Sequence, residues 1–156
     1  MSSREFGCIG GDGVDLLLFD GPLLEVEITA PLKLVKYLRE GGFPSFATIR
    51  GLAQIDTGAA VSAVDPSVFK ELDIPSVDRE MVQTAHGLSE LDRYNGSVFF
   101  PQLDTVPMSL SYVLGGQIRR QVAGGADIIM LVGRDLLQHF TFTYDGPRSR
   151  FIVDTA

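Results

Sequence analysis

The chain has 156 residues, which is long enough for one domain with a hydrophobic core. Hydrophobic residues make up 45% and charged residues 21%, a balance that excludes a disordered chain. The formal net charge of -7 argues against nucleic acid or an anionic membrane as a partner, because both require a basic face.

The residues that bind metals or form disulfides are scarce. Cys8 is the only cysteine, and His86 and His139 lie far apart in the sequence, so we expect no disulfide, no metal centre and no cofactor. The first residues lack the apolar segment of a signal peptide. No stretch approaches the roughly 18 apolar residues that a membrane span needs. We therefore expect a cytoplasmic protein that does not enter a membrane.

The first third of the chain alternates short elements with turns. Leu16–Phe19 is an apolar run that predicts a strand, and Leu23–Thr29 shows the period of two expected of a half-buried strand. Apolar residues at helical spacing follow Pro31 until Gly41-Gly42, which predicts a helix there. Strand character returns from about Ser45 to Ile55.

The middle of the chain contains one helix and several strands. A short helix is predicted for Pro66–Leu72, with Asp65 as its N-cap. Strands joined by turns are expected between Val77 and Val122, because clusters of Gly, Asn and Pro interrupt this segment.

The C-terminal segment completes the predicted domain. Ile128–Val132 is an apolar run typical of a strand buried on both faces, Arg134–Phe140 is a candidate third helix, and Thr141–Val153 predicts a final hairpin. The whole pattern predicts one mainly β domain with two or three short helices. We place an N-terminal extension at residues 1–22 and the domain at residues 23–156.

The most informative segment contains Asp56, Thr57 and Gly58. Asp56 comes at the end of an apolar strand and is followed at once by Thr-Gly-Ala. Such a string has an ordinary interpretation, since an aspartate in a turn often hydrogen-bonds its own backbone. A second segment, Met130–Leu137, places two hydrophobic residues and a glycine before Arg-Asp-Leu-Leu. Together, in this order, the two segments favour a catalytic role for Asp56.

In these segments the sequence resembles the retroviral-type (retropepsin-like) aspartic proteases, with a match from about Leu23 to Val153. The resemblance implies a retropepsin-like acid protease barrel with one half-site per chain. Asp56 would be catalytic, Thr57 would brace the loop across a dimer axis, and Gly58 would permit close backbone approach. Ala59 would contact a peptide or protein substrate. Because the sequence holds a single Asp-Thr-Gly, a second copy of the chain would supply the other carboxylate.

The resemblance also implies a flap, a hairpin that closes over the substrate. The best candidate is Val82–Val98, with its tip and substrate contacts near His86 and Gly87, although Asn95-Gly96 is a competing turn. Strand alternation places Gln54 on the same face as Asp56, so Gln54 is predicted to line the substrate cleft. The other interpretation of Gln54 is a hydrogen bond within the sheet.

The sequence departs from the retroviral members in two places, and a third segment is expected at the dimer interface. Many retroviral members carry an acid after Asp-Thr-Gly-Ala that pairs with the arginine of the second segment, but here that position is Ala60. Arg134 must then contact Asp65 or a terminal carbonyl group, or remain solvated. The predicted helix within residues 31–43 is an addition expected at the rim. The final strand, Arg150–Val153, is expected at the dimer interface, because both chain termini build the dimer sheet in the viral enzymes.

Three functions remain open from the sequence. The leading hypothesis is a homodimeric aspartic endopeptidase that hydrolyses extended peptide segments. The alternative is a catalytically weak or inactive dimeric module of the same fold that binds peptides or regulates a partner. A chance motif in an unrelated β-barrel is the third interpretation.

Overall fold

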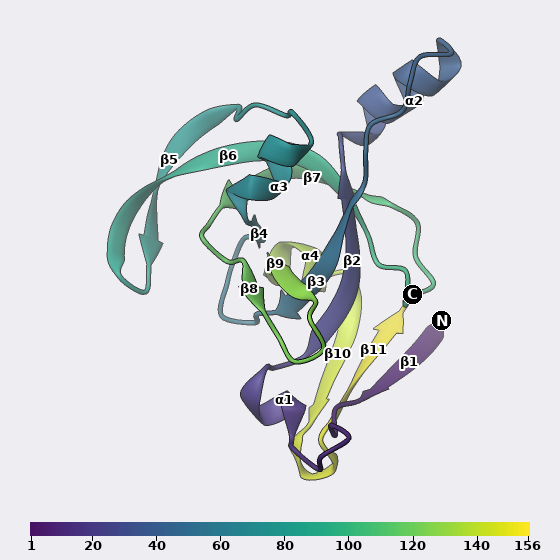
Figure 1. Ribbon diagram of the computed structural model, residues 1–156, viewed down its shortest axis with the longest axis vertical. Coiled ribbons are helices and arrows are strands. Elements are labelled where there is room, and N and C mark those ends of the chain that lie inside the picture. Colours follow the sequence, from purple (N-terminus) through teal and green to yellow (C-terminus); the bar gives the residue numbers. More distant parts are fainter.

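A computed structural model describes residues 1–156 as a mainly β protein with four short helices (Figure 1). The strands are β1 (Ser2–Gly7), β2 (Leu23–Thr29), β3 (Ile49–Ile55), β4 (Ala63–Val64), β5 (Asp78–Thr84), β6 (Gly87–Phe99), β7 (Met108–Gly115), β8 (Arg120–Gln121), β9 (Asp127–Val132), β10 (Phe140–Asp145) and β11 (Arg150–Thr155). The helices are α1 (Leu16–Phe19), α2 (Leu32–Glu40), α3 (Pro66–Glu71) and α4 (Arg134–Leu137), with a 3-10 turn, η1, at Gly146–Arg148. The predicted mainly β class is confirmed.

Six strands close into a barrel. They follow the order β2-β3-β9-β4-β7-β6, and a pairing between β2 and β6 completes the circle. The apolar faces of these strands point inward, and a cluster of 22 buried residues forms the core. Strand β5 extends the sheet beyond β6, and β8 pairs with β9.

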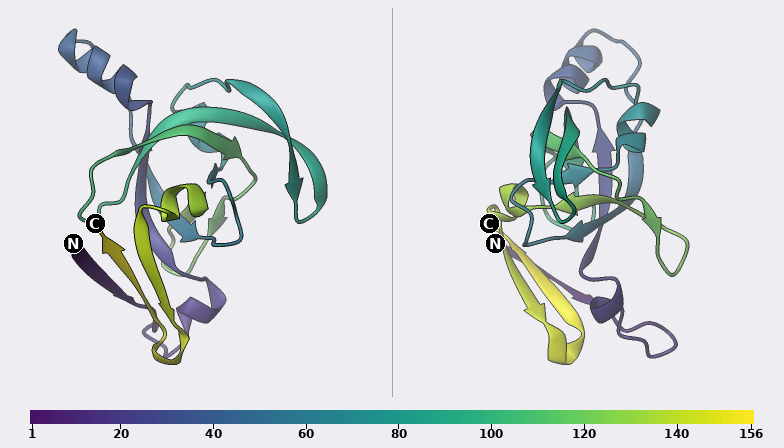
Figure 2. Two further views of the ribbon diagram at one scale, coloured as in Figure 1. Left: turned by 180° about the vertical axis from the view of Figure 1, so that it is seen from behind. Right: turned by 90° about the vertical axis from the view of Figure 1, so that its left-hand side faces the viewer.

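A second sheet of three strands has the order β1-β11-β10. All six residues of β1 pair antiparallel with β11, and all six of β10 pair with its other edge. The rings of Phe6 in β1 and Phe151 in β11 stack with their centroids 4.7 Å apart, and this contact stabilises the pairing of the two strands. Figure 2 shows this sheet on one side of the barrel with the two chain ends close together. The domain boundary at residue 22 stays a prediction.

Several elements match the sequence predictions. Strand β2 has the predicted bounds, and α2 lies between Pro31 and Gly41 as predicted. Asp65 is the N-cap of α3, where its side chain accepts a hydrogen bond from the backbone amide of Ser67. Helix α2 has no buried residue and projects from the barrel (Figures 1 and 2).

Other predictions were wrong in detail. Leu16–Phe19 is a single helical turn and not a strand, so the helices number four. Asp15 decides this local structure, because its carboxylate accepts the amide of Leu18 at 3.0 Å as a helix N-cap does. Helix α4 ends at Leu137, and β10 begins at Phe140. None of the helices combines the length and the apolar character needed to cross a membrane.

Candidate active site

Asp56 lies where β3 leaves the barrel. Ile55, just before it, is buried, and the backbone amide of Asp56 still donates to the carbonyl of Val132 on β9 at 3.0 Å. Asp56 itself is half-buried, whereas Thr57 and Gly58 are exposed. The strand thus places one carboxylate at the surface, directly after the buried residues Ala53 and Ile55.

The carboxylate of Asp56 has one fixed oxygen. Its Oδ1 accepts the backbone amide of Gly58 at 3.0 Å, and its Oδ2 has no hydrogen-bond partner within the chain. A Cβ atom added to Gly58 would lie 3.2 Å from Oδ1, so glycine permits this close approach. The contact is the turn-type hydrogen bond that an Asp-Thr-Gly string makes, and it leaves Oδ2 free for an external group.

Helix α4 holds the loop that follows Asp56. The amide of Arg134 donates to the carbonyl of Ala59 at 2.9 Å, and the amide of Asp135 donates to Ala60 at 3.2 Å. The Arg134 guanidinium donates to the carbonyl of Thr57 at 2.8 Å. The partner of Arg134 is therefore this loop carbonyl, and the candidate partner Asp65 was wrong, because the Asp65 carboxylate accepts from Ser67, Ile118 and Arg119. These three hydrogen bonds from Arg134 and Asp135, together with the bond from the Asp56 amide to Val132, join the two segments that were singled out in the sequence.

Asp135 and Ser62 form a second contact behind the loop. Both carboxylate oxygens of Asp135 lie 3.0 Å from the amide nitrogen of Ser62, and Oδ1 also accepts the Ser62 hydroxyl at 2.7 Å. The Ser62 hydroxyl oxygen in turn accepts the amide of Gly133 at 2.9 Å. Ser62 is fully buried. Asp135 lies within the second motif, but its role could not be predicted from the sequence because Ser62 lies 73 residues away in the chain.

Gln54 contacts the turn before β2. Its amide nitrogen donates to the carbonyl of Asp20 at 2.9 Å, a contact outside the sheet. Gly21 has φ of +78°, and a Cβ there would lie 2.8 Å from the Gln54 amide nitrogen. The carboxylate of Asp20 also lies 3.7 Å from the guanidinium of Arg120. The side chain of Gln54 is thus already engaged, and its predicted role in substrate binding stays a prediction.

The hairpin predicted as a flap is formed by β5 and β6, and its closure over a substrate stays a prediction. Thr84 pairs with Gly87, which places the turn at Ala85-His86 and confirms the predicted position of the tip. Gly87 has φ of +107°, which glycine adopts readily, and the Thr84 hydroxyl donates to its carbonyl at 2.9 Å. Asn95-Gly96 lies inside β6 at a register shift, so the competing turn was wrong.

The hairpin extends from the barrel as a curved two-stranded ribbon (Figure 2). Ion pairs between Arg93 and Asp78, at 2.7 Å, and between Arg79 and Asp92, at 2.9 Å, cross its two strands. The Arg93 guanidinium lowers the pKa of Asp78 below its ordinary value. His86 is exposed at the tip. Substrate contacts from His86, Gly87 and Ala59 remain predictions.

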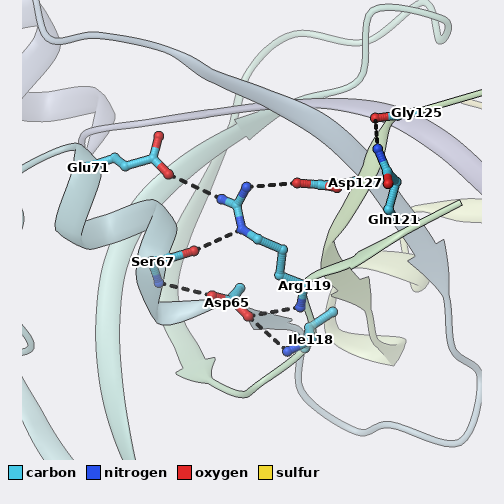
Figure 3. Close-up of polar contacts among 8 residues, drawn as sticks. All are labelled: Asp65, Ser67, Glu71, Ile118, Arg119, Gln121, Gly125 and Asp127. Atoms are coloured by element: carbon cyan, nitrogen blue, oxygen red, sulfur yellow. Dashed lines mark hydrogen bonds and ion pairs between the residues drawn. The ribbon is translucent and has the colours of Figure 1, made fainter.

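Asp65 connects α3 to the loop that contains Ile118 and Arg119 (Figure 3). Besides capping the helix, it accepts the amides of Ile118 and Arg119 on one carboxylate oxygen, at 3.0 and 2.8 Å. Partial burial raises the pKa of Asp65, but hydrogen bonds from Arg119, Ser67 and Ile118 outweigh this effect and hold the pKa below its usual value.

Arg119 and Asp65 belong to one cluster of polar contacts, together with Ser67, Glu71 and Asp127 (Figure 3). Its guanidinium contacts Ser67 at 3.0 Å, Asp127 at 3.0 Å and Glu71 at 3.3 Å. These contacts join α3 to the start of β9 through the segment that leads into β8. Because β9 supplies the carbonyl that receives the Asp56 amide, the cluster helps to fix the strand beside the candidate site.

Comparisons with known proteins find similar solved structures, among them two proteases. No protein-family model matches the chain, and no curated protein matches it. The chain is similar to the simian foamy virus (mac) protease, with 16% identity and a TM-score of 0.44, over 75% of this chain and 92% of that one. It is also similar to a retropepsin-like aspartic protease from Rickettsia conorii, with 15% identity and a TM-score of 0.49, over 97% of this chain and 91% of that one.

Proposed function

We propose that this chain is one subunit of a homodimeric aspartic endopeptidase. The observation that carries the proposal is the carboxylate of Asp56, which lies at the end of a barrel strand, on a loop held by hydrogen bonds from α4, with Oδ2 unpartnered. A single carboxyl group cannot be ionised as the base and protonated as the acid in the same step. Since the chain has one Asp-Thr-Gly string, the second carboxylate is that of Asp56 in a second copy.

The chemistry follows from the proximity of two carboxylates. Two such groups a few ångströms apart share one proton, because both cannot ionise at that separation. The ionised member takes a proton from a water, which attacks the scissile carbonyl carbon, while the protonated member donates to the carbonyl oxygen. Collapse of the tetrahedral intermediate breaks the C–N bond, and a proton passes to the leaving nitrogen. The pair titrates as a unit, so activity is expected on the acid side of neutrality.

The proposed substrate is an extended peptide segment with apolar residues around the scissile bond. The hairpin of β5 and β6 supplies backbone groups that a peptide can pair with, as in other cases of strand addition. The turn at Ala85-His86 would close over the peptide, and the freedom of Gly87 suits that movement.

The decisive experiment compares the protein with its Asp56→Asn variant on a diverse peptide pool between pH 4 and pH 7. Asp73→Asn is the matched control, because Asp73 is exposed, makes no side-chain hydrogen bond, and has a positive φ that asparagine tolerates. We expect cleavage by the parent and the control and none by Asp56→Asn. Cleavage that survives Asp56→Asn would refute the aspartic mechanism. Peptide binding without cleavage by the parent would favour the binding module.

A further inference from the structure

Gln54 lies beside Asp56 on the outward face of β3. Side chains alternate along a strand, so these two residues point to the same face, whereas Ile55 between them is buried. Leu131 of β9 pairs with Gln54 and is half-buried. The side-chain oxygen of Gln54 has no hydrogen-bond partner, since only its amide nitrogen is engaged, with the carbonyl of Asp20. The surface next to Asp56 therefore has a polar side as well as an apolar one.

Arg120 extends the polar side through Asp20. Its guanidinium lies 3.7 Å from the Asp20 carboxylate, and the backbone carbonyl of the same aspartate accepts the Gln54 amide. Arg120 lies in β8, and the pairing of β8 with β9 fixes its backbone. The three residues thus form a row that begins at Gln54, beside Asp56, and ends at Arg120.

The guanidinium of Arg120 has unused hydrogen-bonding capacity. A distance of 3.7 Å from Asp20 is too long for a hydrogen bond, and 46% of the Arg120 side chain is exposed. Arg119 differs, because side chains of α3 and β9 accept hydrogen bonds from its guanidinium (Figure 3). Arg120 is therefore a cation whose N–H groups are available to a group from outside the chain.

The sheet register gives the distance of Arg120 from the candidate active site. Arg120 pairs with Ile128 of β9, and Ile128 pairs with Leu52 of β3. Leu52 precedes Asp56 by four residues. At about 3.3 Å per residue, Arg120 lies about 13 Å from Asp56 along the strand direction. An extended peptide laid along this direction has a similar rise, so a side chain three or four residues from the scissile bond comes level with Arg120.

We infer that Arg120 selects peptides with an aspartate or glutamate three or four residues from the scissile bond. The inference rests on the proposed function, which places an extended peptide beside Asp56. A guanidinium can donate two parallel hydrogen bonds to a carboxylate, a geometry that neutral side chains do not reproduce. Asp20 holds one side of the guanidinium and leaves the rest exposed. The acidic residue adds a charge requirement to the apolar residues proposed around the scissile bond.

A positional scan tests this specificity. Peptides that the parent cleaves are remade with Glu or Gln at each position and compared at pH 6, where glutamate is ionised because its ordinary pKa is about 4.3. We expect kcat/KM to favour Glu over Gln by about tenfold at one position, since a hydrogen bond to a charged group discriminates by this order. Arg120→Gln should bring this ratio close to one. The absence of such a position, or a ratio unchanged in Arg120→Gln, overturns the inference.

Lys36→Gln is the matched control for the loss of a positive charge. Lys36 is exposed on α2, which projects from the barrel, and its ion pair with Glu40 has a similar length, 3.8 Å. We expect this variant to keep the parent's ratio of Glu to Gln. Loss of the ratio in Lys36→Gln would show that net charge, and not the position of Arg120, sets the preference.

Charge reversal separates recognition from a structural role. Arg120→Glu is expected to favour Lys over Gln at the same position, because the acid of the variant then attracts a cation. A role of Arg120 only in holding Asp20 predicts no such inversion. Thermal unfolding of each variant shows whether it is folded. A folded Arg120→Glu variant that still favours Glu contradicts the inference.

Peptide capture by immobilised Asp56→Asn protein makes the test independent of catalysis. The peptide pool is passed over this protein with and without Arg120→Gln, and the acidic content of the retained peptides is compared. Retention of acidic peptides that depends on Arg120, without cleavage by the parent, would refute the protease proposal alone. Cleavage without any acidic preference would refute the specificity alone. A pool that is neither cleaved nor retained overturns both.

Discussion

Asp135 holds Ser62 through both of its carboxylate oxygens, each 3.0 Å from the Ser62 amide nitrogen, although 73 residues separate the two in the chain. The contact places a buried polar group behind the loop of Asp56. The two residues before Asp135 contact the same region. The amide of Gly133 donates to the Ser62 hydroxyl, and the guanidinium of Arg134 donates to the carbonyl of Thr57 in the loop. The shape of the candidate active site thus depends on the residues between β9 and β10.

Asp135→Ala is expected to destabilise the protein. The amide and hydroxyl of Ser62 are buried and would lose their acceptor, which costs about 1–3 kcal/mol for an unsatisfied group. Asp135→Asn retains one acceptor oxygen and should lose less. Urea unfolding measures both, with Glu90→Gln, at an exposed position on the hairpin, as the control. Equal stability of the parent and Asp135→Ala would contradict this role.

Arg134→Lys is expected to affect activity more than stability. The Arg134 side chain is exposed, so the free energy of unfolding should change by less than about 1 kcal/mol. A lysine ammonium lacks the planar guanidinium geometry that reaches the Thr57 carbonyl. We therefore expect kcat to fall by about tenfold or more, since misplacement of a catalytic loop raises the barrier. Thermal unfolding and peptide cleavage on the same preparation separate the two effects, and a large loss of stability with unchanged kcat would oppose this expectation.

Asp65 makes stability depend on pH in a predictable direction. Its pKa in the folded protein is lowered, because hydrogen bonds outweigh the opposing effect of burial. A lowered carboxyl pKa contributes stability above the unfolded value of about 3.9, and this contribution is lost as the pH falls through the folded pKa. The stability difference between the parent and Asp65→Asn should therefore shrink when unfolding is measured at pH 3 and compared with pH 7. A difference that stays constant or grows at low pH would argue against this linkage, and Asp73→Asn provides the baseline.

Gly87→Ala tests the tip of the hairpin. An alanine methyl group at this position would meet no atom within 4 Å, so only the positive φ opposes the change. The conformational cost is expected at about 1–2 kcal/mol, confined to the tip, with an increase in KM if the hairpin closes over substrate. His86→Ala is the companion variant, since it keeps an ordinary backbone conformation at the same turn. If both variants leave KM at the parent value, the tip does not contact substrate.

Local patterns in the sequence predicted much of the fold. The alternation of Leu23–Thr29 predicted β2, and the Asp-Pro pair at residues 65–66 predicted the start of α3. The predicted position of the hairpin tip near His86 and Gly87 was also correct, and Gly87 adopts the positive φ that follows the turn. Leu16–Phe19 was misjudged because four apolar residues suit a strand or a helix equally, and the N-cap at Asp15 was overlooked.

The sequence by itself determined the position of Asp56 at the end of an apolar strand, the elements on either side of it, and the count of one catalytic-type aspartate per chain. Only the tertiary structure decided that Arg134 bonds to Thr57, that Asp135 bonds to Ser62, and that β11 lies in the middle of its sheet while β10 has a free edge. The physical reason is distance along the chain. Period and capping reveal interactions within a few residues, whereas these contacts form only when the barrel closes and brings β9 and α4 beside the loop after β3.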